Sequence, residues 1–226
     1  MPTDAASFDA GTNVNLLPRL VLASASPRRR ELFGLFGLPY EVIPSRYEEP
    51  TAPAHPISLA EFTQNLATEK AREVAARTPG AWVIGADTEV SLEPVGSPLG
   101  KPQDTEDAAR MLKMLSGRSH LVCTGVTLIQ VSESGAMQSP LQIAVSTRVT
   151  FRPLSAAMIA DYVATGEPMD KAGAYGAQGY AAPFIERIEG DFFNVVGLPI
   201  CALGQLLEQA GLDWQKLRAS DKEKIF

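Results

Sequence analysis

The chain has 226 residues, which is enough for one α/β domain or for two small lobes with a substantial core. Hydrophobic residues make up 45% and charged residues 20%, as in ordinary soluble proteins, and no apolar run approaches the roughly 18 residues that span a membrane. The net charge of −6 argues against a protein that coats nucleic acid, although a local cluster of cations is enough to bind a nucleotide.

The N-terminal residues 1–17 are polar and rich in small side chains, and we predict a disordered extension there. They lack the basic and apolar stretches of a secretory signal. The folded part of the chain is therefore expected to begin near residue 18.

The first structured segment is predicted to be a strand, a turn and a helix. An apolar run at residues 20–23 is followed by Ser26, a good N-cap, and by Pro27, which is favoured at the first helical position. Three arginines at residues 28–30 then fall in the first turn, where the helix dipole disfavours each exposed cation by about 0.3–1 kcal/mol. A bound phosphate would remove that penalty, and the helical turn allows one or two arginines to contact it. The alternative is an exposed basic helix start.

The rest of the chain alternates between strand-like and helical patterns, which predicts an α/β fold. The further strand-like segments are residues 40–44, 81–92, 121–131 and 141–151. The helical segments are residues 58–77, 104–115, 155–164 and a last helix through Leu207. The first of these begins with a Ser58–Glu61 capping box. The β-rich runs on either side of Ser134 and Gly135 predict an antiparallel hairpin, and strands of both senses predict a mixed sheet.

The cysteines and histidines do not suggest covalent catalysis. Cys123 and Cys201 lie in apolar strings and fit no disulfide or zinc pattern, so both are expected to be reduced core residues in the cytoplasm. Neither has an obvious local histidine partner, since His55 lies in a Pro-rich loop and His120 at a strand start, and no G-x-S-x-G motif occurs. We expect His120 to be a hydrogen-bonded structural residue.

Asp87 is the first candidate for chemistry, because it interrupts a mostly apolar strand. A buried carboxylate needs a cation, a metal or a set of donors, since burying it alone is costly. The functional interpretation is a metal ligand or a general base, and the alternative is an aspartate that closes a turn. Glu89 points to the same face if the strand continues, and we expect it to be exposed at an edge rather than to widen an acidic site.

Two loop glutamates and two lysines are weaker candidates. Glu48 and Glu49 follow the second strand, and a hard divalent cation often takes one or two carboxylates, with phosphates and waters completing its shell. Lys101, held extended by Pro102, is a candidate counter-ion for phosphate, whereas nothing local singles out Lys70. The alternative for all four is a solvated surface residue.

Residues 170–179 contain three glycines at a spacing of three, which fits neither a helix interior nor a regular strand. Within this run Tyr175 supplies a flat face, and the Gln178 amide can both donate to and accept from the edge of a base. The alternative is a tight structural loop. Neither a P-loop motif nor G-x-G-x-x-G occurs in the chain.

Taken in order, these motifs resemble the Maf family of nucleoside triphosphate pyrophosphatases. The matching stretches are residues 22–29, 48–49, 69–71, 84–88, 100–102, 115–120, 167–176 and 196–199, within about residues 19–210. The run at 170–179 is most similar to the branch that acts on dTTP and UTP. One departure is Glu89, which stands where an apolar residue is usual.

The resemblance implies a mixed twisted sheet with flanking helices and two lobes around a central cleft, related to the inosine triphosphate pyrophosphatase fold. The domain would cover residues 18–212 and be followed by a C-terminal tail at 213–226. The implied enzyme is cytoplasmic and hydrolyses dTTP and UTP, with modified pyrimidine triphosphates as candidate substrates, to the monophosphate and pyrophosphate. Neither nucleic acid nor a membrane is an expected partner. It depends on a divalent metal cation, Mg²⁺ or Mn²⁺.

The resemblance also assigns roles to residues. The proton acceptor matches Asp87, and the metal is expected on Glu49 and Asp87. The other activity-bearing positions match Ser24, Arg29, Glu49, Lys70 and Lys101. The specificity positions match Arg28, Thr88 and Gln178.

Two other functions stay open: a cell-division regulator that senses nucleotides without hydrolysing them, and a pyrophosphatase directed at purines. Release of pyrophosphate from dTTP with added Mn²⁺ separates the first from hydrolysis, and a nucleotide panel separates the second. The oligomeric state, monomer or homodimer, is also left open by the sequence.

Overall fold

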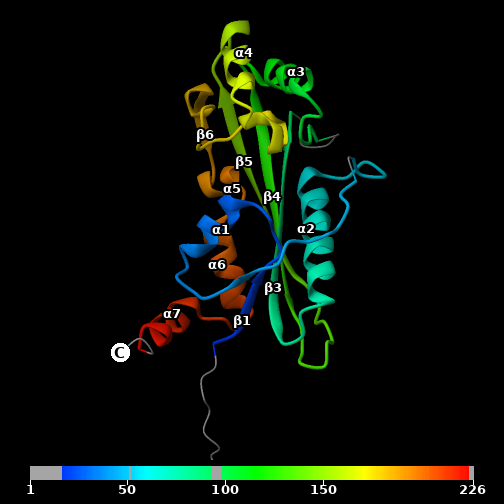
Figure 1. Ribbon diagram of the computed structural model, residues 1–226, viewed down its shortest axis with the longest axis vertical. Coiled ribbons are helices and arrows are strands. Elements are labelled where there is room, and N and C mark those ends of the chain that lie inside the picture. Colours follow the sequence, from blue (N-terminus) through cyan, green and yellow to red (C-terminus); the bar gives the residue numbers. More distant parts are fainter. Residues whose placement is uncertain (1–16, 51, 93–97, 224–226) are drawn as a thin grey trace, which may run out of the picture.

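A six-stranded mixed sheet forms the long axis of the protein in this computed structural model, which describes residues 17–50, 52–92 and 98–223 (Figure 1). Nearly all of the predicted disordered extension lies outside the described residues. The strands are β1 (Arg19–Leu22), β2 (Glu41–Val42), β3 (Ala81–Ser91), β4 (Ser119–Gln130), β5 (Leu141–Phe151) and β6 (Ile185–Glu189). Their order in the sheet is β2-β1-β3-β4-β5-β6.

Seven α-helices and three short 3₁₀ helices are found in the described part of the chain. The α-helices are α1 (Pro27–Gly34), α2 (Leu59–Ala75), α3 (Thr105–Leu115), α4 (Ala156–Ala164), α5 (Phe192–Val196), α6 (Ile200–Gln209) and α7 (Trp214–Glu223). The 3₁₀ helices are η1 (Glu167–Asp170), η2 (Ala172–Ala174) and η3 (Ala182–Phe184). None of the described helices is long and apolar enough to cross a membrane.

The sheet confirms the predicted mixture of strand directions. Strand β1 pairs in parallel with β2 and β3, whereas β3, β4, β5 and β6 pair antiparallel, with β4 and β5 forming the predicted hairpin. Strand β2 is shorter than the predicted segment 40–44. Its last hydrogen bond to β1 runs from the Ile43 amide to the Leu22 carbonyl, at 3.1 Å.

Local capping explains where the first two helices begin. The Ser26 hydroxyl accepts a hydrogen bond from the Arg29 amide, and Pro27 occupies the first turn. The Ser58 hydroxyl accepts in the same way from the Glu61 amide, 3.1 Å away. Both predicted helix starts are therefore confirmed.

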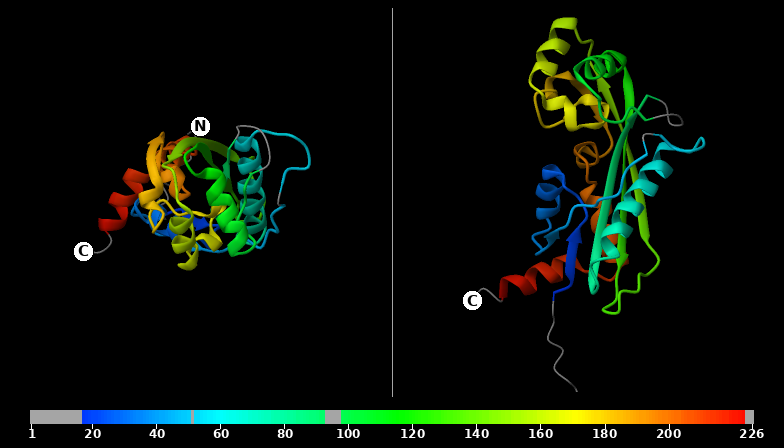
Figure 2. Two further views of the ribbon diagram at one scale, coloured as in Figure 1. Left: turned by 90° about the horizontal axis from the view of Figure 1, so that it is seen from above. Right: turned by 45° about the vertical axis from the view of Figure 1, so that its right-hand side comes forward.

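The strands carry two separate apolar clusters on one face of the sheet. The helices over these clusters form two lobes, one at each end of the strands (Figure 2). Helices α1 and α6 pack over one end of the strands, on Ile84, Ala86, Val126 and Leu128. Helices α3 and α4 pack over the other end, on Val90, Val122, Val149 and Phe151. Helix α2 covers the opposite face, mainly against β3 and β4.

Two expectations about the C-terminal part of the chain are wrong. The helix through Leu207 is not the last, because the Asp213 side chain caps α7 and Trp214 packs edge-on against Phe36, with ring centroids 5.5 Å apart. Cys201 is exposed rather than buried, since it lies on the outer side of α6, whose inner side is formed by Leu203 and Leu207. Cys123 is buried, as expected.

Candidate active site

The site forms where β3 runs on past the end of β1. Leu22 pairs with Ile84, and the Ala23 amide makes the last contact of that ladder, donating to the Ile84 carbonyl at 2.8 Å. Within the described residues, no strand pairs with this edge of β3 from residue 85 to residue 89. Asp87 and Thr88 therefore project to opposite sides of an open edge.

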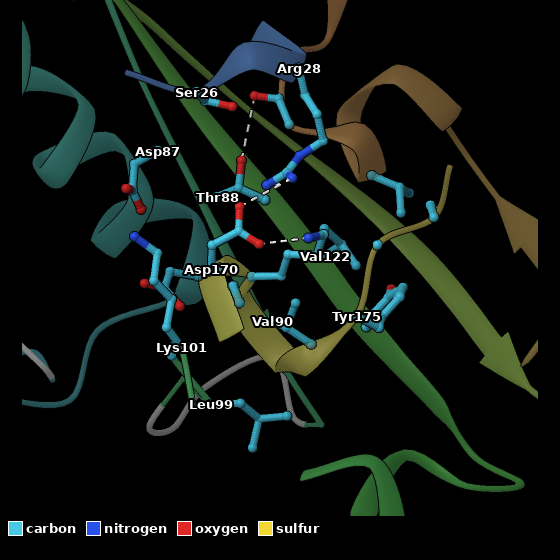
Figure 3. Close-up of a pocket in the computed structure, with 18 of the residues that line it drawn as sticks. Ser26, Arg28, Asp87, Thr88, Val90, Leu99, Lys101, Val122, Asp170 and Tyr175 are labelled. Atoms are coloured by element: carbon cyan, nitrogen blue, oxygen red, sulfur yellow. Dashed lines mark hydrogen bonds and ion pairs between the residues drawn. The ribbon is translucent and has the colours of Figure 1, made fainter. Parts of the chain in front are cut away.

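A cavity of about 640 Å³ lies at this edge (Figure 3). Eight of the nine predicted site residues line it, namely Arg28, Arg29, Glu49, Lys70, Asp87, Thr88, Lys101 and Gln178. The ninth, Ser24, is buried behind it and contacts Arg29. The expectation that one or two arginines face a ligand fits this arrangement, because Arg30 does not line the cavity.

The cation that pairs with Asp87 is Lys70, a residue that its local sequence does not single out. The Lys70 ammonium lies 2.5 Å from Asp87 Oδ1 and 2.8 Å from Glu49 Oε1. The pair with Asp87 is well buried, since the side chains of Lys70 and Asp87 are only 12% and 5% exposed. Burial opposes ionisation of Glu49, but the cations around it, Lys70 first, outweigh this and lower its pKa.

Two glycines bring Lys70 within reach of Asp87. A Cβ at Gly85 would collide with the backbone of Ala67, and one at Gly125 would collide with the backbone of Thr63. Both contacts are with α2, so the missing side chains let this helix pack directly on β3 and β4. The signal lies in two glycines of separate strands, which sequence reasoning did not connect with Lys70.

Arg29 is held by three hydrogen bonds and offers its remaining donors to the cavity. Nε donates to the Gly197 carbonyl at 2.8 Å, Nη1 to the Ser24 hydroxyl at 3.4 Å, and Nη2 to the Thr88 hydroxyl at 3.0 Å. Burial lowers its pKa, opposed by Asp87 and Glu49, but an arginine stays charged in proteins. Of its five N–H donors, two are left for a ligand.

The glycine-rich segment forms the opposite wall of the cavity. Gly173 has a φ of 67°, which favours glycine, and its amide donates to the Gly100 carbonyl at 2.8 Å, next to Lys101. The segment therefore has a structural role as well as a place in the site. Gln178 is exposed on its cavity side.

Asp170 lies in the same wall, and sequence reasoning assigned it no role. The Asp170 carboxylate lies 2.6 Å from the Lys171 ammonium and 3.5 Å from the Arg28 guanidinium, and so links α1 to η1 across the cavity (Figure 3). Burial opposes ionisation of Asp170, but these two cations lower its pKa.

His120 and Tyr175 support the same wall from behind. His120 is fully buried, and its Nε2 atom forms a hydrogen bond with the Tyr175 hydroxyl, 2.8 Å away. Tyr175 in turn lines the cavity. Burial lowers the pKa of His120 to about 4, so the ring is neutral near pH 7. The expectation of a structural, hydrogen-bonded histidine is confirmed.

Glu89 corrects another expectation, because it lines the cavity instead of standing exposed at an edge. It follows Asp87 by two residues on the same side of β3, so the strand pattern did contain the signal. Burial, with the nearby carboxylates of Asp87 and Glu49, raises its pKa to about 8. Glu48, the other loop glutamate, does not line the cavity.

The chain is similar to one protein-family model and to several known proteins. The family model described as Maf-like protein matches residues 19–210. A dTTP/UTP pyrophosphatase of Moorella thermoacetica is 50% identical over 198 residues, covering 87% of this chain and 97% of its own length. One of Thermococcus onnurineus is 50% identical over 189 residues, covering 84% and 96%. The solved structure of a HAM1 protein from Coxiella burnetii covers 91% of this chain and 98% of its own, with a TM-score of 0.44 and 16% identity.

Proposed function

Because the chain belongs to the Maf family, we propose that it hydrolyses dTTP and UTP to the monophosphate and pyrophosphate, clearing such nucleotides from the cytoplasmic pool. Relatives of nearly the same length that share about half of its residues carry the name dTTP/UTP pyrophosphatase. The observation that carries the proposal is one cavity in which Asp87 faces the cations Arg29, Lys70 and Lys101.

The charges of the cavity suit a polyphosphate chain. Six cations and five carboxylates line it, and most of the cations already have an acidic partner: Lys70, Arg28, Lys171 and Arg110. Among the described residues, Arg29 and Lys101 line the cavity without an ion pair. We assign these two to the phosphates, with Ser24 fixing the guanidinium of Arg29.

Asp87 is positioned to accept a proton. A water oxygen attacks the α-phosphorus, the bond from that phosphorus to the bridging oxygen breaks, and pyrophosphate leaves with the bridging oxygen. The proton of the water goes to Asp87, whose Oδ2 is buried and unpartnered while Oδ1 is held by Lys70. Lys70 and Glu49 keep this carboxylate in place, and Arg29 and Lys101 stabilise the charge that develops on the phosphates.

The donor set also fits a divalent cation, Mg²⁺ or Mn²⁺. Carboxylate oxygens are the ligands that such ions prefer, and Asp87 Oδ2 is a buried oxygen without a partner. An ionised carboxylate has about four lone-pair sites, so Asp87 can face both a cation and a water while Lys70 holds its other oxygen. Glu49 and Asp87 would hold the ion, which would supply positive charge to the bound phosphates.

Selection of the base is assigned to Arg28, Thr88 and Gln178. Gln178 is exposed to the cavity with an amide that can read a base edge. The Thr88 hydroxyl accepts from Arg29 and lies 2.9 Å from the Thr124 hydroxyl, so its contribution acts through the position of Arg29. Arg28 reaches the same wall through Asp170.

The test is pyrophosphate release from a nucleotide panel with added Mn²⁺. The wild type should hydrolyse dTTP and UTP in preference to GTP, and Asp87→Asn should abolish turnover without changing the far-UV circular dichroism. Gln178→Ala should raise GTP hydrolysis relative to dTTP. A wild type that binds dTTP without releasing pyrophosphate would instead be a nucleotide sensor. Sizing of the same preparation distinguishes a monomer from a homodimer.

A further inference from the structure

Two carboxylates of β3, Asp87 and Glu89, stand next to each other on the side of the strand that faces α2. Both line the cavity. Asp87 Oδ2 and Glu89 Oε2 are each buried, and neither has a hydrogen-bond partner. Buried carboxylate oxygens are normally paired, so a pair of unsatisfied ones in one cavity requires an explanation.

The described side chains do not supply the missing partner of these two oxygens. Lys70 is already shared between Asp87 and Glu49, at 2.5 and 2.8 Å. Arg29 is fixed by its bonds to Gly197, Ser24 and Thr88. No hydrogen bond or ion pair joins Glu89 to a cation within the described part of the chain. A bound cation would supply the partner that these two oxygens lack in the described part of the chain.

We propose that Glu89 is a ligand of the divalent cation in this site, beside Asp87. The inference rests on the proposed function, which brings a triphosphate and its metal into the cavity. In the described residues no three ligand-type side chains converge into a ready-made cage. In this proposal Glu89 takes the place assigned above to Glu49, whose carboxylate lies 2.8 Å from the Lys70 ammonium. The two β3 carboxylates suit an ion that keeps phosphate oxygens and waters in its remaining positions.

The experiment is a titration of the full chain with Mn²⁺ alone, in which electron paramagnetic resonance reports the free aqueous ion. Glu89→Gln removes the charge and keeps the shape of the side chain. Glu186→Gln is the matched control, because Glu186 is exposed on β6 and outside the cavity. We expect the dissociation constant for Mn²⁺ to rise at least about tenfold in Glu89→Gln and to stay unchanged in Glu186→Gln.

Two further measurements make the outcome decisive. Glu89→Asp retains a carboxylate and should bind Mn²⁺ with an affinity between those of the wild type and Glu89→Gln. The Mn²⁺ concentration for half-maximal dTTP hydrolysis should rise in Glu89→Gln, with activity recovering at high Mn²⁺. Equal Mn²⁺ affinity in the wild type and Glu89→Gln overturns the inference, even if the wild type hydrolyses dTTP. A wild type that does not hydrolyse dTTP overturns the proposed function, while the Mn²⁺ titration still decides the role of Glu89.

Discussion

Acidification should destabilise this protein through one buried histidine. His120 is fully buried between Phe151 and Tyr175, and burial lowers its pKa from 6.5 to about 4. Between about pH 4 and pH 6.5, His120 therefore carries a proton in the unfolded chain but not in the folded chain. Stability from this source is complete above about pH 6.5 and is lost as the pH falls towards 4. At about 1.4 kcal/mol for each pKa unit, the loss is about 3 kcal/mol.

The variant that isolates this effect is His120→Phe. It cannot titrate and keeps an aromatic ring against Phe151, but it leaves the Tyr175 hydroxyl unpaired at a cost of about 1–3 kcal/mol that does not vary over this pH range. Urea unfolding, followed by the fluorescence of Trp82 and Trp214, gives the free energy of unfolding at each pH. The difference between the wild type and His120→Phe should shrink or reverse as the pH falls from about 7 to about 4. A difference that stays constant over this range would refute the reasoning.

Three further outcomes are expected. Arg29→Lys keeps the charge but loses the three-point anchorage, so kcat/KM for dTTP should fall about a hundredfold; a value near that of the wild type would show that the anchorage is dispensable. Lys70→Met leaves Asp87 buried without its cation and should lower the free energy of unfolding by about 3–5 kcal/mol, whereas Lys113→Met on the exposed side of α3 should not. Gly125→Ala should push α2 away and cost about 1–3 kcal/mol in urea unfolding. Gly34→Ala, whose added Cβ would meet only the Tyr40 hydroxyl at an ordinary van der Waals distance of 3.9 Å, should be neutral or stabilising; equal effects would contradict the close-approach argument.

Much of the fold was predictable because its signals are local. The Ser26 and Ser58 caps and the hairpin around Ser134 each depend on neighbouring residues, and all three appear in the structure. Strand alternation placed Asp87 correctly but was not followed through to Glu89, because the open edge of β3 is set by where β1 ends. That end point is a tertiary property.

Other parts of the site depend on contacts between distant segments. Lys70 acquires its partner only because two strands carry glycines under α2, and Asp170 meets Arg28 only once the two lobes face each other. Cys201 shows the same limit for burial, since an apolar string does not reveal which side of a helix faces the core.

The sharing of strands by both lobes has a mechanical consequence. Strands β3 and β4 contribute Ile84 and Val126 to one apolar cluster and Val90 and Val122 to the other, so the two halves are joined by strands that they share. Any narrowing of the cavity around a nucleotide must bend these continuous strands, so the two lobes would close by elastic bending of the sheet and not by rotation about a hinge. Asp87 lies on β3 between the parts of the strand that pack in the two clusters. Bending of the sheet would therefore change the distance between the Asp87 carboxylate and the phosphate.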